Sequence, residues 1–436
     1  MRLFIPVLHR LIAPTLLIAA CLCATPRAQQ PAADAQRNGA LPAPLPLLPA
    51  DNWWNQDVSQ APVDARSAQF ITFVNNGGLR RLHPDFGGYE SPGSVNIYGF
   101  PFAVVGGTQP KRAVSFYYDD ESDGVNHATG QSVPFYPIPD EAISQPYWIE
   151  GGAPGSADPG GDRHMLIVDR DNRHLYELYD LHWNGSQWTA GSGAFYDLNA
   201  NTRRPDGWTS ADAAGLAILP GLVRYDEVFG PDEIRHAFRV TVRSTNGYVY
   251  PASHRAGSNS QALPMGARLR LKASKDLTPF TPEVRKIFRA MQRHGLIVAD
   301  NGSDMYVSGA FDPRWNNDVL NPAFRALSAS DFDVVELGWR GGAGGGTTCA
   351  TPGAASPFSF SQSGGYVVLV WAAAAGAADY VIEVGSGPGM SNLLVTPVGS
   401  ATTLSAIAPP GRYYARIRSR NACGLGAASN EIVVTI

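Results

Sequence analysis

The sequence predicts an all-β protein of two domains: a large, mainly antiparallel sandwich of jelly-roll type with one or two covering helices, and a smaller C-terminal β-sandwich. Three observations support this prediction. Short runs of alternating, β-branched or aromatic residues separated by turn signals recur along most of the 436 residues. A Gly-rich linker at residues 341–348 divides them into two segments. One clear helical period is found before that linker.

The first 28 residues have the pattern of a removed secretory signal. Arg2 and Arg10 flank its start, the apolar stretch 11–21 is too short to span a bilayer, and small residues follow. We therefore expect a secreted protein, extracellular or periplasmic. Residues 18–21, Ile-Ala-Ala-Cys, also match a lipobox, so a lipoprotein anchored through Cys21 is the alternative.

The net charge of the mature chain excludes some classes of binding partner. Removal of the signal takes away three arginines and no acidic residue, so the formal net charge falls from −4 to −7. This mild acidity argues against nucleic acid or an anionic membrane as partner. No later apolar run reaches spanning length, so we expect no transmembrane segment. Residues 29–49, rich in Ala and Pro, are predicted to be a linker.

The large domain, residues 50–340, is predicted strand by strand. An alternating strand is expected at 113–118, and a hairpin is expected to join 165–168 to 174–179 through a polar turn. Asn-Gly pairs inside alternating segments are the strongest short hairpin signal. They predict two further hairpins, one around residues 183–186 and one that joins 236–242 to 248–250.

An amphipathic helix is predicted after Thr281, which can act as its N-terminal cap. Pro282 fits the first turn, and apolar residues recur at i, i+3, i+4 and i+7 from Val284 to Met291 before Gly295 ends the period. We expect this helix to cover the sheet core. Strand character then returns at residues 296–298 and 305–307.

The C-terminal segment shows strands at residues 366–371, 380–384, 412–419 and 431–436, with turn signals between them. On the Trp371 strand and on residues 378–384, 410–418 and 429–434, the segment 349–436 resembles a fibronectin type III domain. The resemblance implies an immunoglobulin-like sandwich with Trp371 in its core and Tyr413 or Tyr414 at a corner. It also implies a spacer or accessory role, so we expect the function to reside in the large domain.

Cysteine usage agrees with export. Cys349 and Cys423 are the two cysteines that remain once the signal is removed. An oxidising compartment is expected to join them in a disulfide bond.

The stretch from residue 206 to 236 concentrates polar chemistry among apolar residues. Asp212 and Glu227 suit glycoside cleavage, with one carboxyl as acid and the other as nucleophile or base. His236 as a base, with an arginine that neutralises the substrate, suits a polysaccharide lyase instead. The structural alternative is that Asp212 caps a turn, Glu227 begins a short helix and His236 opens a strand.

Further candidates surround that stretch. Trp208 and Arg224 are candidate substrate-binding residues. Asp162 and His164 enter a predicted strand after a Gly-rich loop and are a candidate acid/base pair, although both also fit structural roles. Residues 206–236 further resemble a group of exported bacterial proteins, and that resemblance implies no activity.

Several familiar motifs are incomplete or missing. Residues 119–124 imitate the start of a calcium loop, but Gly130 stands where a bidentate Glu is required, so calcium stays open and no cofactor is indicated. The sequence lacks HExxH and G-x-S-x-G motifs, a P-loop and a dinucleotide fingerprint, and CxxC is absent after the signal. We therefore assign no metal-ligating residues, and we expect no zinc or haem site and no nucleotide chemistry.

The large domain holds eight of the chain's nine tryptophans, and tryptophan rings can stack on sugars. At least half of them are expected in the core instead, and Trp148 is retained as a candidate for substrate binding. We expect the protein to act on an extracellular polysaccharide as a glycoside hydrolase or polysaccharide lyase. The alternative is a non-catalytic carbohydrate-binding or cell-envelope interaction protein.

Overall fold

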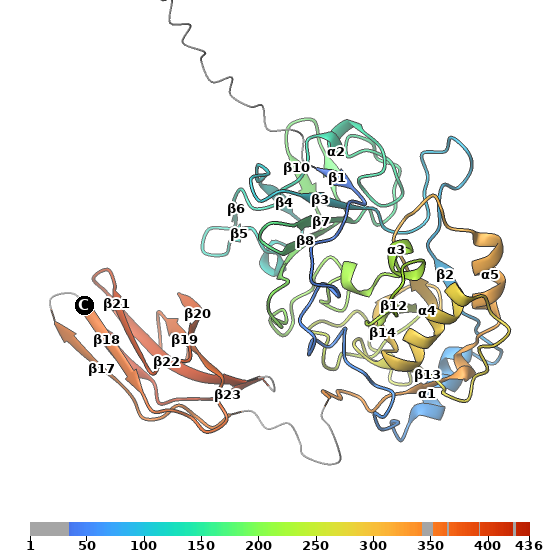
Figure 1. Ribbon diagram of the computed structural model, residues 1–436. Coiled ribbons are helices and arrows are strands. Elements are labelled where there is room, and N and C mark those ends of the chain that lie inside the picture. Colours follow the sequence, from blue (N-terminus) through green and yellow to red (C-terminus); the bar gives the residue numbers. More distant parts are fainter. Residues whose placement is uncertain (1–34, 342–351, 364–365, 392, 422–423) are drawn as a thin grey trace, which may run out of the picture.

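The computed structural model describes residues 35–341, 352–363, 366–391, 393–421 and 424–436 (Figure 1). The predicted all-β class is confirmed, because strands in several sheets form the cores and the helices are few. The signal segment, most of the Gly-rich linker, Cys21, Cys349 and Cys423 lie outside the described residues.

The first sheet of the large domain has the strand order β1-β3-β7-β8-β11. Its strands are β1 (Gln36–Arg37), β3 (Phe102–Val105), β7 (Met165–Asp169), β8 (His174–Tyr179) and β11 (Ser192–Asp197). The predicted hairpin of β7 and β8 is confirmed. Strands β3 and β7 run parallel, whereas the other neighbours are antiparallel.

The second sheet has the order β16-β13-β14-β12-β15-β2. Its strands are β2 (His83–Asp85), β12 (Phe238–Val242), β13 (Arg268–Leu271), β14 (Leu296–Asn301), β15 (Tyr306–Ser308) and β16 (Phe332–Val334). Antiparallel pairs predominate among the described strands of the large domain, although β12 runs parallel to β14 and β15 parallel to β2.

The alternation of side chains along β3 and β7 creates two cores. Phe102, Val104, Leu166 and Val168 face the core shared with the second sheet. The residues between them face a second core that contains Trp148 and Trp188. Because successive side chains of a strand point to opposite faces, the first sheet is covered on both sides.

Short strands complete the upper part of the large domain in Figure 1. A three-stranded sheet contains β4 (Val114–Phe116), β9 (His182–Trp183) and β10 (Trp188–Ala190), and β5 (Val125–Asn126) pairs with β6 (Gln131–Ser132). Strands β9 and β10 form the hairpin predicted around the Asn-Gly pair at residues 184–185. That prediction is confirmed.

The second predicted Asn-Gly hairpin is wrong. Strand β12 pairs with β14 on one side and β15 on the other, and residues 248–250 do not form a strand. Both edges of this central strand are thus occupied by segments distant in the sequence, and all five of its residues are buried. Asn246 and Tyr248 instead bridge Ser258 and Met265.

The predicted helix is α4 (Pro282–Arg293), and the Thr281 hydroxyl accepts a hydrogen bond from the Val284 N–H at 3.4 Å. It is followed directly by β14. The other helices are α1 (Ser67–Asn75), α2 (Glu141–Ser144), α3 (Tyr225–Val228) and α5 (Asn317–Arg325), with single turns η1 (Asp119–Glu121), η2 (Leu219–Gly221) and η3 (Ala329–Asp331).

The described part of the predicted linker 29–49 belongs to the large domain. Strand β1 pairs with β3, and Leu47 and Leu48 are buried in the main core. The Arg173 guanidinium donates to the carbonyls of Ala43 and Leu47, each at 2.6 Å. Backbone pairing and buried leucines therefore hold a segment whose composition alone is typical of a spacer.

The C-terminal strands form two sheets that face each other. One contains β17 (Phe358–Ser363), β18 (Tyr366–Trp371) and β21 (Thr403–Ile407); the other contains β19 (Asp379–Gly385), β20 (Leu394–Gly399), β22 (Arg412–Asn421), β23 (Gly424–Ala428) and β24 (Ile432–Thr435). Trp371 lies in the core, as expected. The Tyr413 hydroxyl donates to the Pro409 carbonyl at 2.9 Å, the geometry expected of the corner tyrosine.

Candidate functional site

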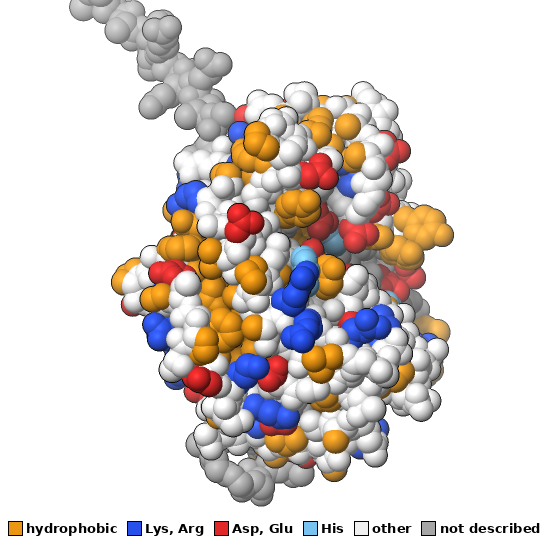
Figure 2. All heavy atoms as spheres, turned by 90° about the vertical axis from the view of Figure 1, so that its right-hand side faces the viewer, with side chains coloured by type: hydrophobic (Ala, Val, Ile, Leu, Met, Phe, Trp, Pro, Cys, Tyr) orange, Lys and Arg blue, Asp and Glu red, His pale blue; other side chains and the backbone are white. Residues whose placement is uncertain are grey.

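A cavity of about 420 Å³ in the large domain has the size of a small-molecule or sugar site. It is lined by Tyr118, Glu121, Asp162, His164, Tyr179, Ser192, Thr209, Ser210, Ala211, Asp212, Ala213, His254, Asp300 and Asn301. On the face seen in Figure 2, acidic side chains and histidine gather where the surface is hollowed.

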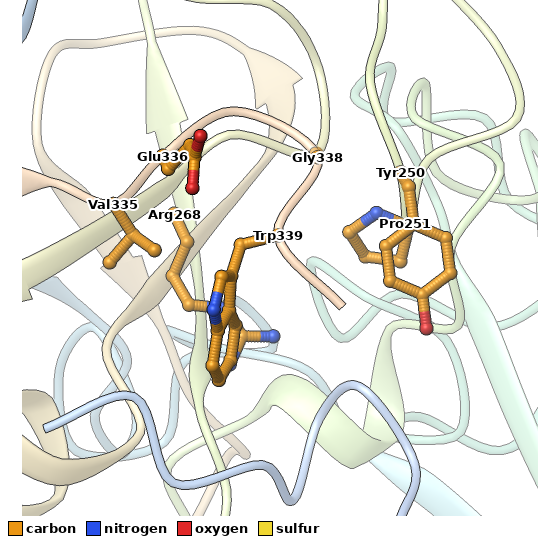
Figure 3. A pocket seen from close by; sticks show the side chains of 8 residues that line it. Tyr250, Pro251, Arg268, Val335, Glu336, Gly338 and Trp339 are labelled. Atoms are coloured by element: carbon orange, nitrogen blue, oxygen red, sulfur yellow. The ribbon is translucent and has the colours of Figure 1, made fainter. Parts of the chain in front are cut away.

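A second hollow is much smaller. Arg268, Trp339 and Tyr250 are among the residues that line it (Figure 3). Its volume of about 10 Å³ holds at most about one water molecule, so it cannot take a sugar. The larger cavity is therefore the candidate site.

Strand order explains why the predicted residues Asp162 and His164 meet Tyr179. The first two precede β7, and Tyr179 ends β8. Because β7 and β8 are antiparallel, the start of β7 and the end of β8 lie at the same end of the hairpin. Asp300 and Asn301 reach the cavity from the end of β14 in the second sheet.

The loop of residues 209–213 forms another wall and is attached to both sheets. The Ser192 hydroxyl on β11 donates to the Ser210 carbonyl at 2.7 Å. Just beyond the loop, the Ala214 N–H donates to the Ala299 carbonyl of β14 at 2.9 Å. The two attachments place Asp212 beside the end of β14.

Arg239 organises the acidic side of the cavity. Its guanidinium contacts both carboxylate oxygens of Asp212, at 2.7 and 2.9 Å, and one oxygen of Asp300 at 2.9 Å. Its remaining terminal nitrogen donates to the Ser308 hydroxyl at 2.8 Å. Burial raises the pKa of Asp212 although Arg239 opposes that rise. With its side chain fully buried and both oxygens engaged, Asp212 is suited to position Arg239 rather than to transfer a proton.

His164 lies beside Asp212 and is a buried cation. Burial disfavours the imidazolium, but the Glu150 carboxylate at 2.6 Å outweighs it and raises the pKa of His164 to about 9. Its Nδ1 faces Glu150 and its Nε2 lies 2.9 Å from the Ala211 carbonyl, so both N–H groups have acceptors. A protonated imidazole with both protons engaged is no general base; it places positive charge near the carboxylates.

Asp162 has a different environment from Asp212. It is exposed at the cavity wall, and its carboxylate has no hydrogen-bond or ion-pair partner among the described residues. Partial burial raises its pKa; nearby His164 opposes this, whereas the negative charges of Glu150 and Asp300 add to it. The pKa of Tyr179 is also raised. Burial is the largest cause, and the negative charges of Asp162 and Asp300 add to it. Asp162 and Asp300 therefore lie close enough to Tyr179 to raise its pKa.

The other predicted residues form a separate cluster. Glu227 lies 2.5 Å from an Arg224 nitrogen and 2.9 Å from the His236 Nε2, and its other oxygen accepts from the Arg224 N–H at 3.0 Å. Although burial raises the pKa of Glu227, Arg224 and His236 lower it overall. None of the three lines the cavity, and in the described residues they share no hydrogen-bond partner with Asp212.

The structural alternative for Glu227 and His236 matches what is observed. Glu227 closes a capping box at the start of α3, and His236 lies two residues before β12. The structure therefore brings together Asp162, His164 and Asp212 of the predicted catalytic set, and places Glu227 and His236 elsewhere.

The two predicted tryptophans also differ. Trp208 is half-buried next to Thr209 of the cavity wall, between the His127 ring at 5.1 Å and the Arg204 guanidinium at 5.4 Å. Trp148 is only 4% exposed and packs in the second core, which leaves no open ring face for a sugar.

Sequence reasoning missed Arg239, Asp300, Tyr179, Glu150 and Glu121. One signal was available for Arg239, because a charged residue stands within the otherwise buried strand β12. In the sequence, Asp300 begins an Asp-Asn-Gly-Ser segment that is typical of a turn, whereas the structure places it at the end of β14.

The described residues contain no group of three or more His, Cys, Asp or Glu side chains placed to hold a metal ion. The start of the calcium-like motif forms the single turn η1. Among the described helices, none has the length and apolar character needed to cross a membrane.

No family model matches the chain, and no curated protein matches it either. The predicted resemblance of residues 206–236 to an exported bacterial group is therefore unsupported. Among solved structures, the chain is similar to fibronectin type III domains. A mutant of FN3tt is 16% identical over 20% of this chain and 96% of its own, with a TM-score of 0.16.

Two further structures of this kind match. An Fn3-like protein from Clostridium thermocellum is 22% identical over 19% of this chain and 88% of its own, with a TM-score of 0.16. The FN5 domain of Drosophila Lar is 19% identical over 19% of this chain and 95% of its own, with a TM-score of 0.17. These matches concern about a fifth of the chain and supply no activity for the large domain.

Proposed function

We propose that the large domain hydrolyses glycosidic bonds of an extracellular polysaccharide, with Asp162 as the general acid and Asp300 as the second carboxylate. The observation that carries this proposal is that two carboxyl groups line one cavity in opposite environments. Asp300 contacts the Arg239 guanidinium, whereas Asp162 has no partner among the described side chains.

The two environments suit the two roles. A general acid must keep its proton near neutral pH, and partial burial shifts the pKa of Asp162 upward, which is the direction that this role requires. The second carboxylate acts as nucleophile or activates water, and the Arg239 guanidinium, 2.9 Å from the Asp300 carboxylate, holds that carboxylate at the cavity wall. Asp212 binds Arg239, and His164 binds the cavity wall through the Ala211 carbonyl.

Cleavage by a lyase is less well supported. A lyase that acts on a uronic acid polymer needs a free cation to neutralise the substrate carboxylate. Arg239 is already bound to Asp212, Asp300 and Ser308, and His164 to Glu150 and Ala211. Carboxylates therefore dominate the open lining of the cavity and would repel such a polymer.

Asp162→Asn and Asp300→Asn test the proposal. Each variant should reduce the release of reducing ends from a polysaccharide panel by at least about 100-fold, because each removes one of the two proton-transfer or nucleophilic groups. In Asp162→Asn, any residual activity should also lose the decline at high pH, since that decline reports deprotonation of the acid.

Asp232→Asn is the matched control, because Asp232 is exposed and has no side-chain partner among the described residues. It should retain full activity. Thermal unfolding of Asp300→Asn separates lost chemistry from lost stability. Unchanged activity in Asp162→Asn would contradict the hydrolase proposal, and an unsaturated, ultraviolet-absorbing product would favour a lyase. Glycan affinity without any cleavage by the wild type would favour a binding module.

A further inference from the structure

Tyr117 and Tyr118 form an exposed aromatic pair at the mouth of the cavity. Their side chains follow β4 directly and are 80% and 46% exposed, and their rings meet edge to face with centroids 4.7 Å apart. Tyr118 lines the cavity, while Tyr117 lies beyond it. We name these two residues the tyrosine platform.

The backbone of the platform is held in place although its rings are open. The N–H groups of Tyr117 and Tyr118 donate to the Ala190 and Gly191 carbonyls at 3.0 and 2.9 Å. The Ser122 hydroxyl donates to the Tyr118 carbonyl at 2.6 Å. A large aromatic ring that is presented to solvent on an anchored backbone suits ligand binding, because little further ordering is needed on contact.

The charges around the platform restrict its ligand. Asp119 and Asp120 follow it and are exposed, and Glu121 lines the cavity. Arg204, which donates to the Glu121 carbonyl, is buried and is also engaged by the Asp123 carboxylate and the Thr209 carbonyl. The residues that line the cavity include no Lys or Arg, so a ligand that carries carboxylates or sulfates would meet like charges there.

We propose that the tyrosine platform is a further sugar-binding subsite, which stacks on a unit of the same polysaccharide chain that enters the cavity, and that this chain is neutral or amine-bearing. The inference rests on the proposed function for the chain's position in the cavity. The flat apolar faces of a pyranose ring complement tyrosine rings, and the tyrosine hydroxyls can hydrogen-bond to its hydroxyl groups. The platform extends the site from one sugar to a stretch of polymer.

Tyr117→Ala and Tyr118→Ala test the platform, with Tyr366→Ala as the control. Tyr366 is 56% exposed on β18 of the C-terminal sandwich and lies outside the cavity. Affinity electrophoresis with hydroxyethyl cellulose, xylan, glucomannan, laminarin and chitosan measures binding without requiring cleavage. Each platform variant should bind its best polymer about tenfold more weakly, as expected for the loss of one aromatic contact, while Tyr366→Ala binds as the wild type does.

Chain length gives a second readout. On oligosaccharides of the best polymer, Tyr117→Ala should raise KM for long chains and leave kcat and the KM of the shortest cleaved chain unchanged, because Tyr117 lies outside the cavity lining. Equal polymer affinity in the platform variants and the wild type would overturn the inference. So would tight binding of alginate or polygalacturonate, or no binding to any of the five polymers. Polymer binding by the platform variants is measured without cleavage, so its outcome does not depend on the activity of Asp162→Asn. The hydrolase proposal is therefore tested separately.

Discussion

At the scale of single residues, the carboxyl groups around the cavity differ because their neighbours differ. Asp212 gives both oxygens to Arg239 in a fully buried contact, whereas Asp162 is exposed and without a described partner. Removing one partner of a buried ion pair leaves an uncompensated charge and typically costs about 3–5 kcal/mol. Replacement of Asp212 should therefore mainly lower the stability of the fold, whereas replacement of Asp162 should mainly lower the catalytic activity.

The pair formed by His164 and Glu150 should make stability depend on pH in a defined direction. The pKa of His164 is raised from its ordinary 6.5 to about 9. The folded state therefore binds this proton more tightly than the unfolded chain. The resulting stabilisation is fully present below pH 6.5 and is lost as the pH rises through about 9, with a slope of up to about 1.4 kcal/mol per pH unit.

Glu150 contributes on the acid side. Burial raises its pKa, but His164 lowers it overall below the ordinary 4.5, so its stabilisation is present above pH 4.5 and is lost on further acidification. Chemical denaturation between about pH 2 and pH 10 measures both limbs, and NMR of the imidazole gives the His164 midpoint directly. A midpoint at or below 6.5 would contradict the ion pair.

At the scale of elements, the loop that carries Asp212 depends on Gly215. Gly215 has a φ of +71°, and a Cβ there would lie 2.0 Å from the Ser253 hydroxyl oxygen and 2.8 Å from the Trp208 carbonyl oxygen. Gly207, near the start of the same loop, has a φ of +89° but open space around it. Alanine substitutions at the two glycines therefore distinguish the cost of backbone strain from the cost of steric overlap.

Gly207→Ala should cost about 1–2 kcal/mol for the left-handed backbone alone. Gly215→Ala should cost about 1–3 kcal/mol more, because the added methyl group also displaces Ser253 or the loop backbone. Because the loop is a wall of the cavity, Gly215→Ala should in addition weaken glycan binding, whereas Gly207→Ala should not. Urea unfolding and affinity electrophoresis measure the two effects, and equal losses of stability in both variants would refute the steric argument.

Elements whose signals are local were predictable. The cap of α4 needs only Thr281 and the N–H three residues on, and the β9 and β10 hairpin needs only its Asn-Gly turn. The hairpin predicted after β12 was wrong because the pairing of β12 depends on strands far away in the sequence. The edges of β12 are occupied by β14 and β15, whose competition for pairing leaves no trace in the sequence near Asn246.

At the scale of the whole molecule, the Gly-rich linker predicts that the large domain folds without the C-terminal sandwich. A protein that comprises residues 29–340 should unfold in one cooperative transition and keep the glycan activity of the full chain. A protein that comprises residues 51–340 should melt at a lower temperature, because it lacks β1 and the buried Leu47 and Leu48. Scanning calorimetry compares the two.

Identical melting temperatures for the two truncated proteins would show that residues 35–50 act as a linker after all. Loss of the cooperative transition in the 29–340 protein would contradict the independence of the domains.

The sequence by itself determined the all-β class, the position of α4, the nearest-neighbour hairpins and three residues of the candidate site, because each depends on residues close along the chain. Only the tertiary structure decided which charges meet. Arg239 binds Asp212 and Asp300, which lie 27 and 61 positions away. Glu227 was separated from them and bound to Arg224 and His236 instead. The order of β14, β12 and β15 in the sheet sets these partners, and long-range strand pairing, unlike a turn or a cap, is not encoded in any short stretch of sequence.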